Sequence, residues 1–200
     1  GYTFQNHAGD AATQAKINSF KWDHVILQAQ SQEPSLDPVQ VAAQTTPYAL
    51  LLDSMVKEND SCSVSTFYET WGRKYGDALN CGGYPPVCTY TGMQDRLKSS
   101  YKIFADTTKG IMAPVGEAFR LSRQLDSNIN LYQSDNSHPS LEGSYLAACV
   151  FYEVLFHKNV SGNTFLASLN SSIALFLQQG AHATVTDSLT LYNLGINAPY

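Results

Sequence analysis

The segment "LYQSDNSHPSLEGSYLAACVFYEVLF" (131–156) contains the two side chains best suited to proton transfer. Asp135 and His138 are three residues apart, and Pro139 follows where helices commonly begin. A carboxylate at this spacing can accept a hydrogen bond from the imidazole Nδ1, which leaves Nε2 free to take a proton from a hydroxyl. The same residues could instead form a helix cap, with Asp135 or Ser137 capping and His138 incidental. The spacing alone leaves both interpretations open.

Strands and helices are predicted to alternate along the chain. Apolar, β-branched runs predict three strands: 22–30, 63–72 and 110–116. Helical spacing predicts one or two helices over 38–59, and further helices over 92–106, 117–126, the segment after Pro139, and 164–180. Such alternation is typical of parallel βαβ units with helices on both faces of the sheet.

Polar residues follow the predicted strands, where parallel sheets carry their sites. Gln28 and Gln30 end the first strand, Trp71 ends the second, and Asp135 with His138 follow the last predicted return of the chain. We therefore expect these side chains at one edge of the sheet. Core packing is an equally good explanation for Trp71.

Several segments resemble the conserved blocks of the SGNH (GDSL-type) hydrolases. "DNSHPSLEGSYLAACVFYEVLF" resembles the last block, in which Asp-x-x-His-Pro precedes the closing helix, and "WDHVILQAQSQEP" resembles the third block of a subgroup with Gln-x-Gln in place of Gly-x-Asn. "GYTFQNHA", "TWGRKYGDALNCGGYPPVCTYTGMQDRL" and "MAPVGEAFR" resemble further segments of that subgroup. The resemblance covers about residues 1–185 and implies a three-layer α/β/α fold with a flavodoxin-like parallel sheet. We expect this domain over 1–187 and a C-terminal tail over 188–200.

The resemblance also implies roles for individual residues. His138 would be the general base and later the acid, oriented by Asp135. Gln30 and the backbone N–H of Gly1 would be oxyanion donors. We expect three residues to contact substrate, namely Trp71, Gln28 and His7. The implied chemistry needs no cofactor and no metal.

The nucleophile block of that family has no counterpart in these 200 residues. Ser31, Ser134 and Ser137 do not lie on a strand–Gly-x-Ser–helix turn, so we reject them as nucleophiles. We expect the serine on a segment before Gly1, cleaved off or missing from this sequence, or on a neighbouring subunit. Its strand should pair with the free edge of 25–27, because an open apolar edge invites strand addition.

Two functions remain in competition. The first is a secreted serine ester hydrolase for acyl or acetyl esters, with carbohydrate-linked esters among the candidates. The second is a non-catalytic SGNH-like binding or structural subunit of an extracellular assembly. A flavodoxin-like cofactor binder is disfavoured because the chain lacks a Gly-rich phosphate loop.

The composition limits the class of protein. A hydrophobic content of 44% in 200 residues suits one domain with a full core. The net charge is −5 and Lys or Arg residues do not cluster, which argues against nucleic-acid binding. No apolar run approaches the roughly 18–20 residues that span a bilayer.

The cysteines and sequons favour an exported glycoprotein. Cys81 and Cys88 flank the turn-rich "GGYPPV", which predicts a disulfide, with metal binding as the weaker alternative. Cys149 is expected to be a buried thiol, and the state of Cys62 is left open. Three sequons permit glycosylation, at Asn59, Asn159 and Asn170.

Overall fold

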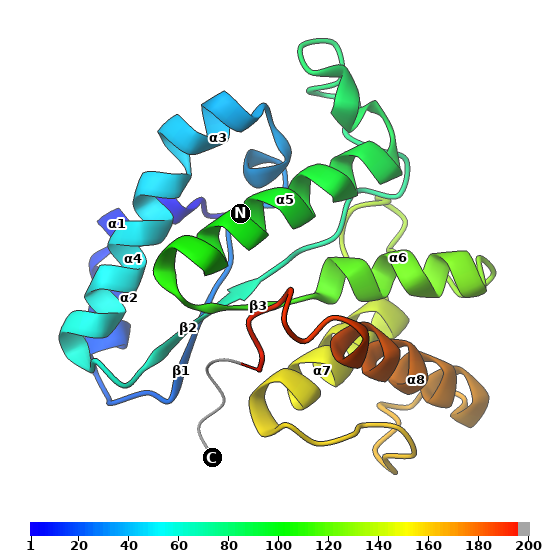
Figure 1. Ribbon diagram of the computed structural model, residues 1–200. Coiled ribbons are helices and arrows are strands. Elements are labelled where there is room, and N and C mark those ends of the chain that lie inside the picture. Colours follow the sequence, from blue (N-terminus) through cyan, green and yellow to red (C-terminus); the bar gives the residue numbers. More distant parts are fainter. Residues whose placement is uncertain (196–200) are drawn as a thin grey trace.

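A three-stranded parallel sheet forms the centre of the protein, as the computed structural model shows for residues 1–195 (Figure 1). The strands are β1 (His24–Leu27), β2 (Val64–Tyr68) and β3 (Ile111–Ala113), in the order β1-β2-β3. They lie within the three predicted segments and are shorter than them. Pro114, which has no N–H to donate, directly follows β3 and precedes the next helix.

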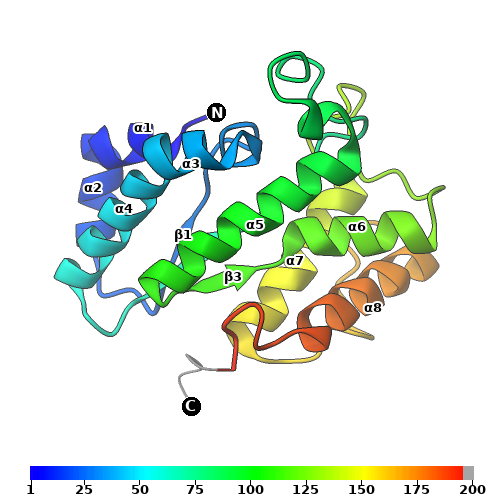
Figure 2. The same cartoon turned by 45° about the horizontal axis from the view of Figure 1, so that its top comes forward.

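The helices form two layers around this sheet (Figures 1 and 2). They are α1 (Phe4–Gly9), α2 (Ala11–Asn18), α3 (Pro38–Gln44), α4 (Thr46–Asn59), α5 (Tyr90–Thr108), α6 (Val115–Leu125), α7 (Leu141–Phe156) and α8 (Ser171–Asp187), with short 3-10 turns at Glu33–Ser35 and Pro85–Cys88.

Neighbouring residues of β2 show how the layers pack, because successive side chains of a strand point to opposite faces. The ring of Phe67 lies 6.2 Å from that of Phe4 in α1 and 6.0 Å from that of Phe104 in α5. The ring of Tyr68 lies 4.8 Å from that of Phe151 in α7, on the other face. The predicted three-layer α/β/α arrangement is therefore confirmed.

The segment 38–59, predicted to form one or two helices, forms two: α3 and α4, with Thr45 between them. One expected helix differs in its limits. The helix predicted over 164–180 begins only at Ser171, because the Asn170 side chain caps it there by accepting from the Ser172 N–H. The residues just before, Ala167 and Ser168, have positive φ values of 48° and 67°, which a helix does not allow.

The described part of the expected tail packs on the domain. Met112 in β3 donates its N–H to the Tyr192 carbonyl oxygen at 3.0 Å, and the side chains of Tyr192 and Leu194 are buried. Residues 188–195 thus cover the far side of β3. Residues 196–200 of that tail lie outside the described residues.

The outer edge of β1 is open within residues 1–195. β1 pairs only with β2, and the Val64 N–H donates to the Asp23 carbonyl oxygen. Since alternate residues of a parallel strand bond to opposite neighbours, the backbone groups of His24 and Ile26 point to the unpaired side. None of the helices in this range is long and apolar enough to cross a membrane.

Candidate active site

A tight loop between α6 and α7 carries Asp135 and His138. Its two arms are joined where Ser140 N–H donates to the Leu131 carbonyl at 2.9 Å and Gln133 N–H donates to the His138 carbonyl at 2.8 Å. Asn136 turns the loop in the left-handed region, with φ of 59°. Asparagine tolerates this conformation better than most residues do.

The predicted contact between Asp135 and His138 is present. His138 Nδ1 lies 2.5 Å from Asp135 Oδ2, while Oδ1 accepts the backbone N–H groups of Ser137 and His138, both at 2.9 Å. The hydrogen bond from His138, followed by these two, lowers the pKa of Asp135 to about 2. The carboxylate is therefore an ionised acceptor at neutral pH, and it favours the tautomer with the proton on Nδ1.

The helix-cap alternative does not account for this pair. The N-cap of α7 is Ser140, whose side chain accepts the Gly143 N–H at 3.1 Å. Asp135 and Ser137 lie several residues before the helix begins, and Asp135 orients His138 instead. The His138 side chain is 73% exposed, which leaves its ring accessible to a reaction partner.

Trp71 joins this loop to the core. Its ring stacks on Phe119 with 4.4 Å between centroids and 7° between planes. Its Nε1 donates to the Ser137 carbonyl oxygen at 2.9 Å, and the nearby Lys74 N–H donates to the Asn136 carbonyl, also at 2.9 Å. The segment after β2 thus holds the loop that carries His138, and the half-buried Trp71 both packs against the core and bonds to the site.

Gln30 and Gly1 lie side by side. A Cβ atom on Gly1 would approach Gln30 Cγ to 3.0 Å, and the Gln30 N–H donates to the Tyr2 carbonyl oxygen at 2.9 Å. The structure therefore brings together the two residues that the sequence suggests as oxyanion donors.

The other two predicted substrate contacts lie elsewhere, along the open edge of β1. His7 in α1 and Gln28 line a mostly apolar groove of about 570 Å³, together with side chains of α2, β1 and α4. Phe4, Ile17, Leu27 and Leu52 contribute its apolar wall. His7 and Gln28 thus line the same groove, whereas Trp71 bonds to the loop of His138.

A chain of polar side chains joins the Gln30 loop to the segment after β2, and the sequence did not suggest it. Gln30 Nε2 donates to Gln32 Oε1 at 2.7 Å, and Gln32 Nε2 donates to Asp77 Oδ2 at 2.8 Å. The Asp77 side chain is buried, although the segment reads as an exposed loop. Its position among turn residues gave no signal of this role.

A second buried carboxylate organises the end of β2. Glu69 accepts hydrogen bonds from Gln94 Nε2 at 2.8 Å and from the Glu117 N–H at 3.3 Å, and Gln94 Oε1 accepts the Gly72 N–H at 2.7 Å. Burial and the nearby Glu117 raise the pKa of Glu69 well above its ordinary value. The sequence feature that could have identified Glu69 is the position of an acidic residue directly after an apolar strand.

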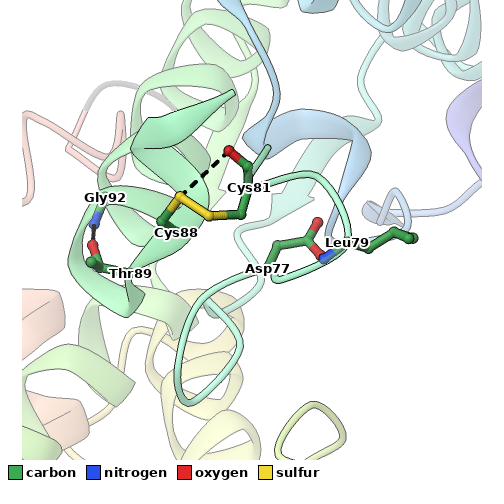
Figure 3. Close-up of a disulfide and its surroundings, with 6 residues drawn as sticks. All are labelled: Asp77, Leu79, Cys81, Cys88, Thr89 and Gly92. Atoms are coloured by element: carbon green, nitrogen blue, oxygen red, sulfur yellow. Dashed lines mark hydrogen bonds between the residues drawn. A yellow bond between two sulfur atoms is a disulfide. The ribbon is translucent and has the colours of Figure 1, made fainter. Parts of the chain in front are cut away.

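The predicted disulfide joins Cys81 and Cys88, whose Cα atoms are 4.6 Å apart (Figure 3). The metal-binding alternative for these two residues is therefore wrong. Cys149 is buried as expected, and Cys62 is an exposed thiol. Over residues 1–195, no three His, Cys, Asp or Glu side chains are grouped to hold a metal ion.

Comparison with known proteins identifies structural neighbours only. No family model and no curated protein matches the chain. A DUF4886 family protein from Bacteroides uniformis superposes with a TM-score of 0.74 and 21% identity, over 87% of this chain and 66% of that one. A proposed SGNH hydrolase from Slackia heliotrinireducens superposes with a TM-score of 0.61 and 26% identity, over 76% of this chain and 79% of that one. This chain thus spans about two thirds of the first neighbour and has the three-layer α/β/α fold of SGNH hydrolases.

Proposed function

We propose that this chain carries the His–Asp part of a secreted serine ester hydrolase of the SGNH type. The observation that carries the proposal is the bond between Asp135 Oδ2 and the Nδ1 of an exposed His138. The Slackia neighbour, a proposed SGNH hydrolase at 26% identity, adds support for hydrolase chemistry. The substrates we propose are acyl or acetyl esters, including carbohydrate-linked ones.

In this proposal His138 moves the protons. Its Nε2 takes the proton of a serine hydroxyl as the oxygen attacks the ester carbonyl carbon, and the carbonyl π electrons move onto oxygen. Gln30 Nε2 and the Gly1 N–H donate to that oxyanion. The protonated His138 then gives its proton to the departing alcohol, and water repeats the sequence to release the acid from the serine.

The open edge of β1 is our proposed site for the strand that bears the serine. The backbone groups of His24 and Ile26 face this edge, and the groove beside it is mostly apolar. We propose that its occupant is a parallel strand from a segment of the same polypeptide before Gly1. The bond between Gln30 N–H and the Tyr2 carbonyl supports this assignment, because it places the start of the described chain beside the carboxyl end of β1.

An extracellular location is part of the same proposal. The Cys81–Cys88 disulfide requires an oxidising compartment in most organisms. The Asn170 sequon is exposed, so it can carry a glycan in the folded protein. The amide nitrogen of Asn59 donates to the Ile17 and Phe20 carbonyls at 3.1 and 2.6 Å, so a glycan there would disrupt two hydrogen bonds.

A fluorophosphonate probe tests the hydrolase function, because it reacts with activated serines. We expect the polypeptide with its upstream segment to be labelled, and His138→Ala to slow labelling at least about 10²-fold by removing the base. His157→Asn is the matched control, since His157 is exposed and its left-handed conformation suits asparagine. Labelling that persists in His138→Ala would remove His138 as the base.

A non-catalytic binding or structural subunit is the alternative. It is favoured by one observation, namely that residues 1–195 contain no serine on a strand–Gly-x-Ser–helix turn. In that case the β1 edge would receive a strand from another subunit. The natural protein would then show no probe labelling. Its intact mass and N-terminal sequence would show no Gly-x-Ser segment before Gly1.

A further inference from the structure

We propose that Asp77 is a positioning residue that aims the side-chain amide of Gln30 through Gln32. The inference rests on the proposed function, in which the Gln30 amide donates to the oxyanion. The geometry it invokes is separate from the chemistry of His138 and can be tested separately.

The oxygen end of the Gln30 amide is held by the backbone. Gln30 Oε1 accepts the N–H groups of Gln32 at 3.0 Å and of Glu33 at 3.2 Å. A backbone N–H group can only donate, so the Gln30 amide cannot flip without losing both bonds. The Nε2 group is thereby forced to the other side.

The nitrogen end is held by Gln32. An amide nitrogen has two hydrogens, and Gln30 Nε2 uses one of them for Gln32 Oε1 at 2.7 Å. Its other hydrogen has no acceptor among the hydrogen bonds of residues 1–195. One donor is thus left in a fixed position, on a side chain whose Cγ and Cβ lie against Gly1.

The direction of the Gln32 amide is set by Asp77. An ionised carboxylate only accepts, so Gln32 must turn its Nε2 towards Asp77 Oδ2, at 2.8 Å, and its Oε1 towards Gln30. Burial acts to raise the pKa of Asp77, but hydrogen bonds from Asn80 and Gln32 and the charge of Arg73 outweigh it and lower the pKa. The chain of amides therefore ends in a charge that remains an acceptor.

The disulfide loop keeps Asp77 in place (Figure 3). Asp77 N–H donates to the Val87 carbonyl at 2.7 Å, and Cys81 N–H donates to the Asp77 carbonyl at 3.0 Å. Cys81 and the residue before Cys88 thus both bond to the backbone of Asp77. The side chain is further held by Leu79 N–H at 3.2 Å.

Two variants break the chain at different links. Asp77→Asn puts a donor group against other donors, because both carboxylate oxygens accept hydrogen bonds: Oδ2 from Gln32 and Asn80, Oδ1 from Arg73 and Leu79. Gln32→Met removes the middle link and leaves Asp77 with its other donors, so it is the variant less disturbing to the fold. Gln44→Met is the matched control, since Gln44 accepts from Gln40 in an exposed amide pair at 3.1 Å.

Side-chain ¹⁵N relaxation on the 200-residue chain measures the result. We expect the order parameter of Gln30 Nε2 to be close to the rigid value of about 0.85 and to fall below about 0.6 in Asp77→Asn and Gln32→Met. In Gln44→Met only the Gln40 amide should change. An unchanged Gln30 amide in folded Gln32→Met would overturn the proposal, and so would a mobile Gln30 amide in the wild type.

The catalytic consequence has its own measurement. In the polypeptide that carries the serine, Gln32→Met should lower kcat about 10²-fold and leave KM nearly unchanged, because the donor acts in the transition state. A wild type in which the Gln30 amide is rigid, but whose kcat equals that of Gln32→Met, would overturn the role of Gln30 towards the oxyanion. Absence of labelling in the wild type would instead contradict the proposed function, while the relaxation data still decide the role of Asp77 in holding Gln30.

Discussion

The indole Nε1 of Trp71 donates a hydrogen bond of 2.9 Å to the carbonyl oxygen of Ser137, next to His138. The same ring stacks on Phe119, which belongs to the core. The loop that carries the candidate base is therefore anchored to the core by the Trp71 side chain, in addition to the bond from the Lys74 N–H to the Asn136 carbonyl. The hydrogen bond can be removed without removing the stack of Trp71 on Phe119, so its contribution to the order of the loop can be measured separately.

Replacing Trp71 with phenylalanine should loosen that loop. The stack on Phe119 can persist, but the Ser137 carbonyl loses its donor, so we expect a loss of about 1 kcal/mol in the free energy of unfolding from the hydrogen bond alone. Faster hydrogen exchange of the amides at 136–138 should accompany it. Trp22→Phe is the control, because Trp22 Nε1 bonds to carbonyls of α2 instead. Equal exchange in both variants would contradict the anchoring role.

The carboxyl group of Asp135 should titrate with a pKa of about 2. Because this value lies below the ordinary 3.8, the pair stabilises the fold above pH 3.8, and the contribution is lost as pH falls through about 2. In His138→Ala the pKa should rise towards the ordinary value, since the His138 side chain is the largest cause of the shift. Carbon-13 NMR of the carboxyl group measures it, and an unshifted titration curve in that variant would disprove the cause.

Glu69 should make the fold less stable at high pH. Its pKa is raised by burial and by Glu117, so its stabilising contribution is full below the ordinary value of 4.5 and is lost as pH rises through the raised pKa. Urea unfolding at several pH values between 4 and 9 should show this loss. Glu69→Gln should remove this pH dependence, and Glu58→Gln, at an exposed position of α4, should retain it.

The disulfide should contribute about 2.5 kcal/mol to the free energy of unfolding, the value expected for closing a loop of about eight residues. The double variant Cys81→Ser/Cys88→Ser should lose this amount and should no longer respond to reductant. Cys62→Ser, at an exposed free thiol, is the control and should leave the stability unchanged. A double variant as stable as the wild type would show that the loop is held by its other contacts.

The open edge of β1 should make the 200-residue chain prone to association. Ile26 is 46% exposed on that edge, and a charge on an edge strand discourages strand addition. We therefore expect Ile26→Lys to reduce light scattering at high protein concentration. Leu51→Lys changes a similarly exposed side chain, 44%, on α4 and should have little effect. Equal reduction by both variants would mean that general charge, and not the edge, controls association.

The order of strands and helices could be predicted from the sequence because it depends on local patterns. The apolar runs of β1, β2 and β3 and the helical spacing of α5 and α6 are visible in short windows. The Asp135–His138 pair could be predicted for the same reason, since three residues separate its members. The loop between Cys81 and Cys88 is also short, so its closure follows from turn-forming residues.

Contacts between side chains far apart in the sequence follow from the packing of the whole fold. Gln32 and Asp77 are 45 residues apart and Trp71 and Ser137 are 66 apart, and no local pattern encodes these contacts. The helix limits at Asn170 and Ser171 likewise depend on a cap and on left-handed residues that competed with helical spacing. The strands, the helices and the local acid–base pair could be read from short windows of sequence, because they depend on near neighbours. The parallel sheet decided the rest, since it brings the carboxyl ends of β1 and β2 to one edge and sets their loops against each other.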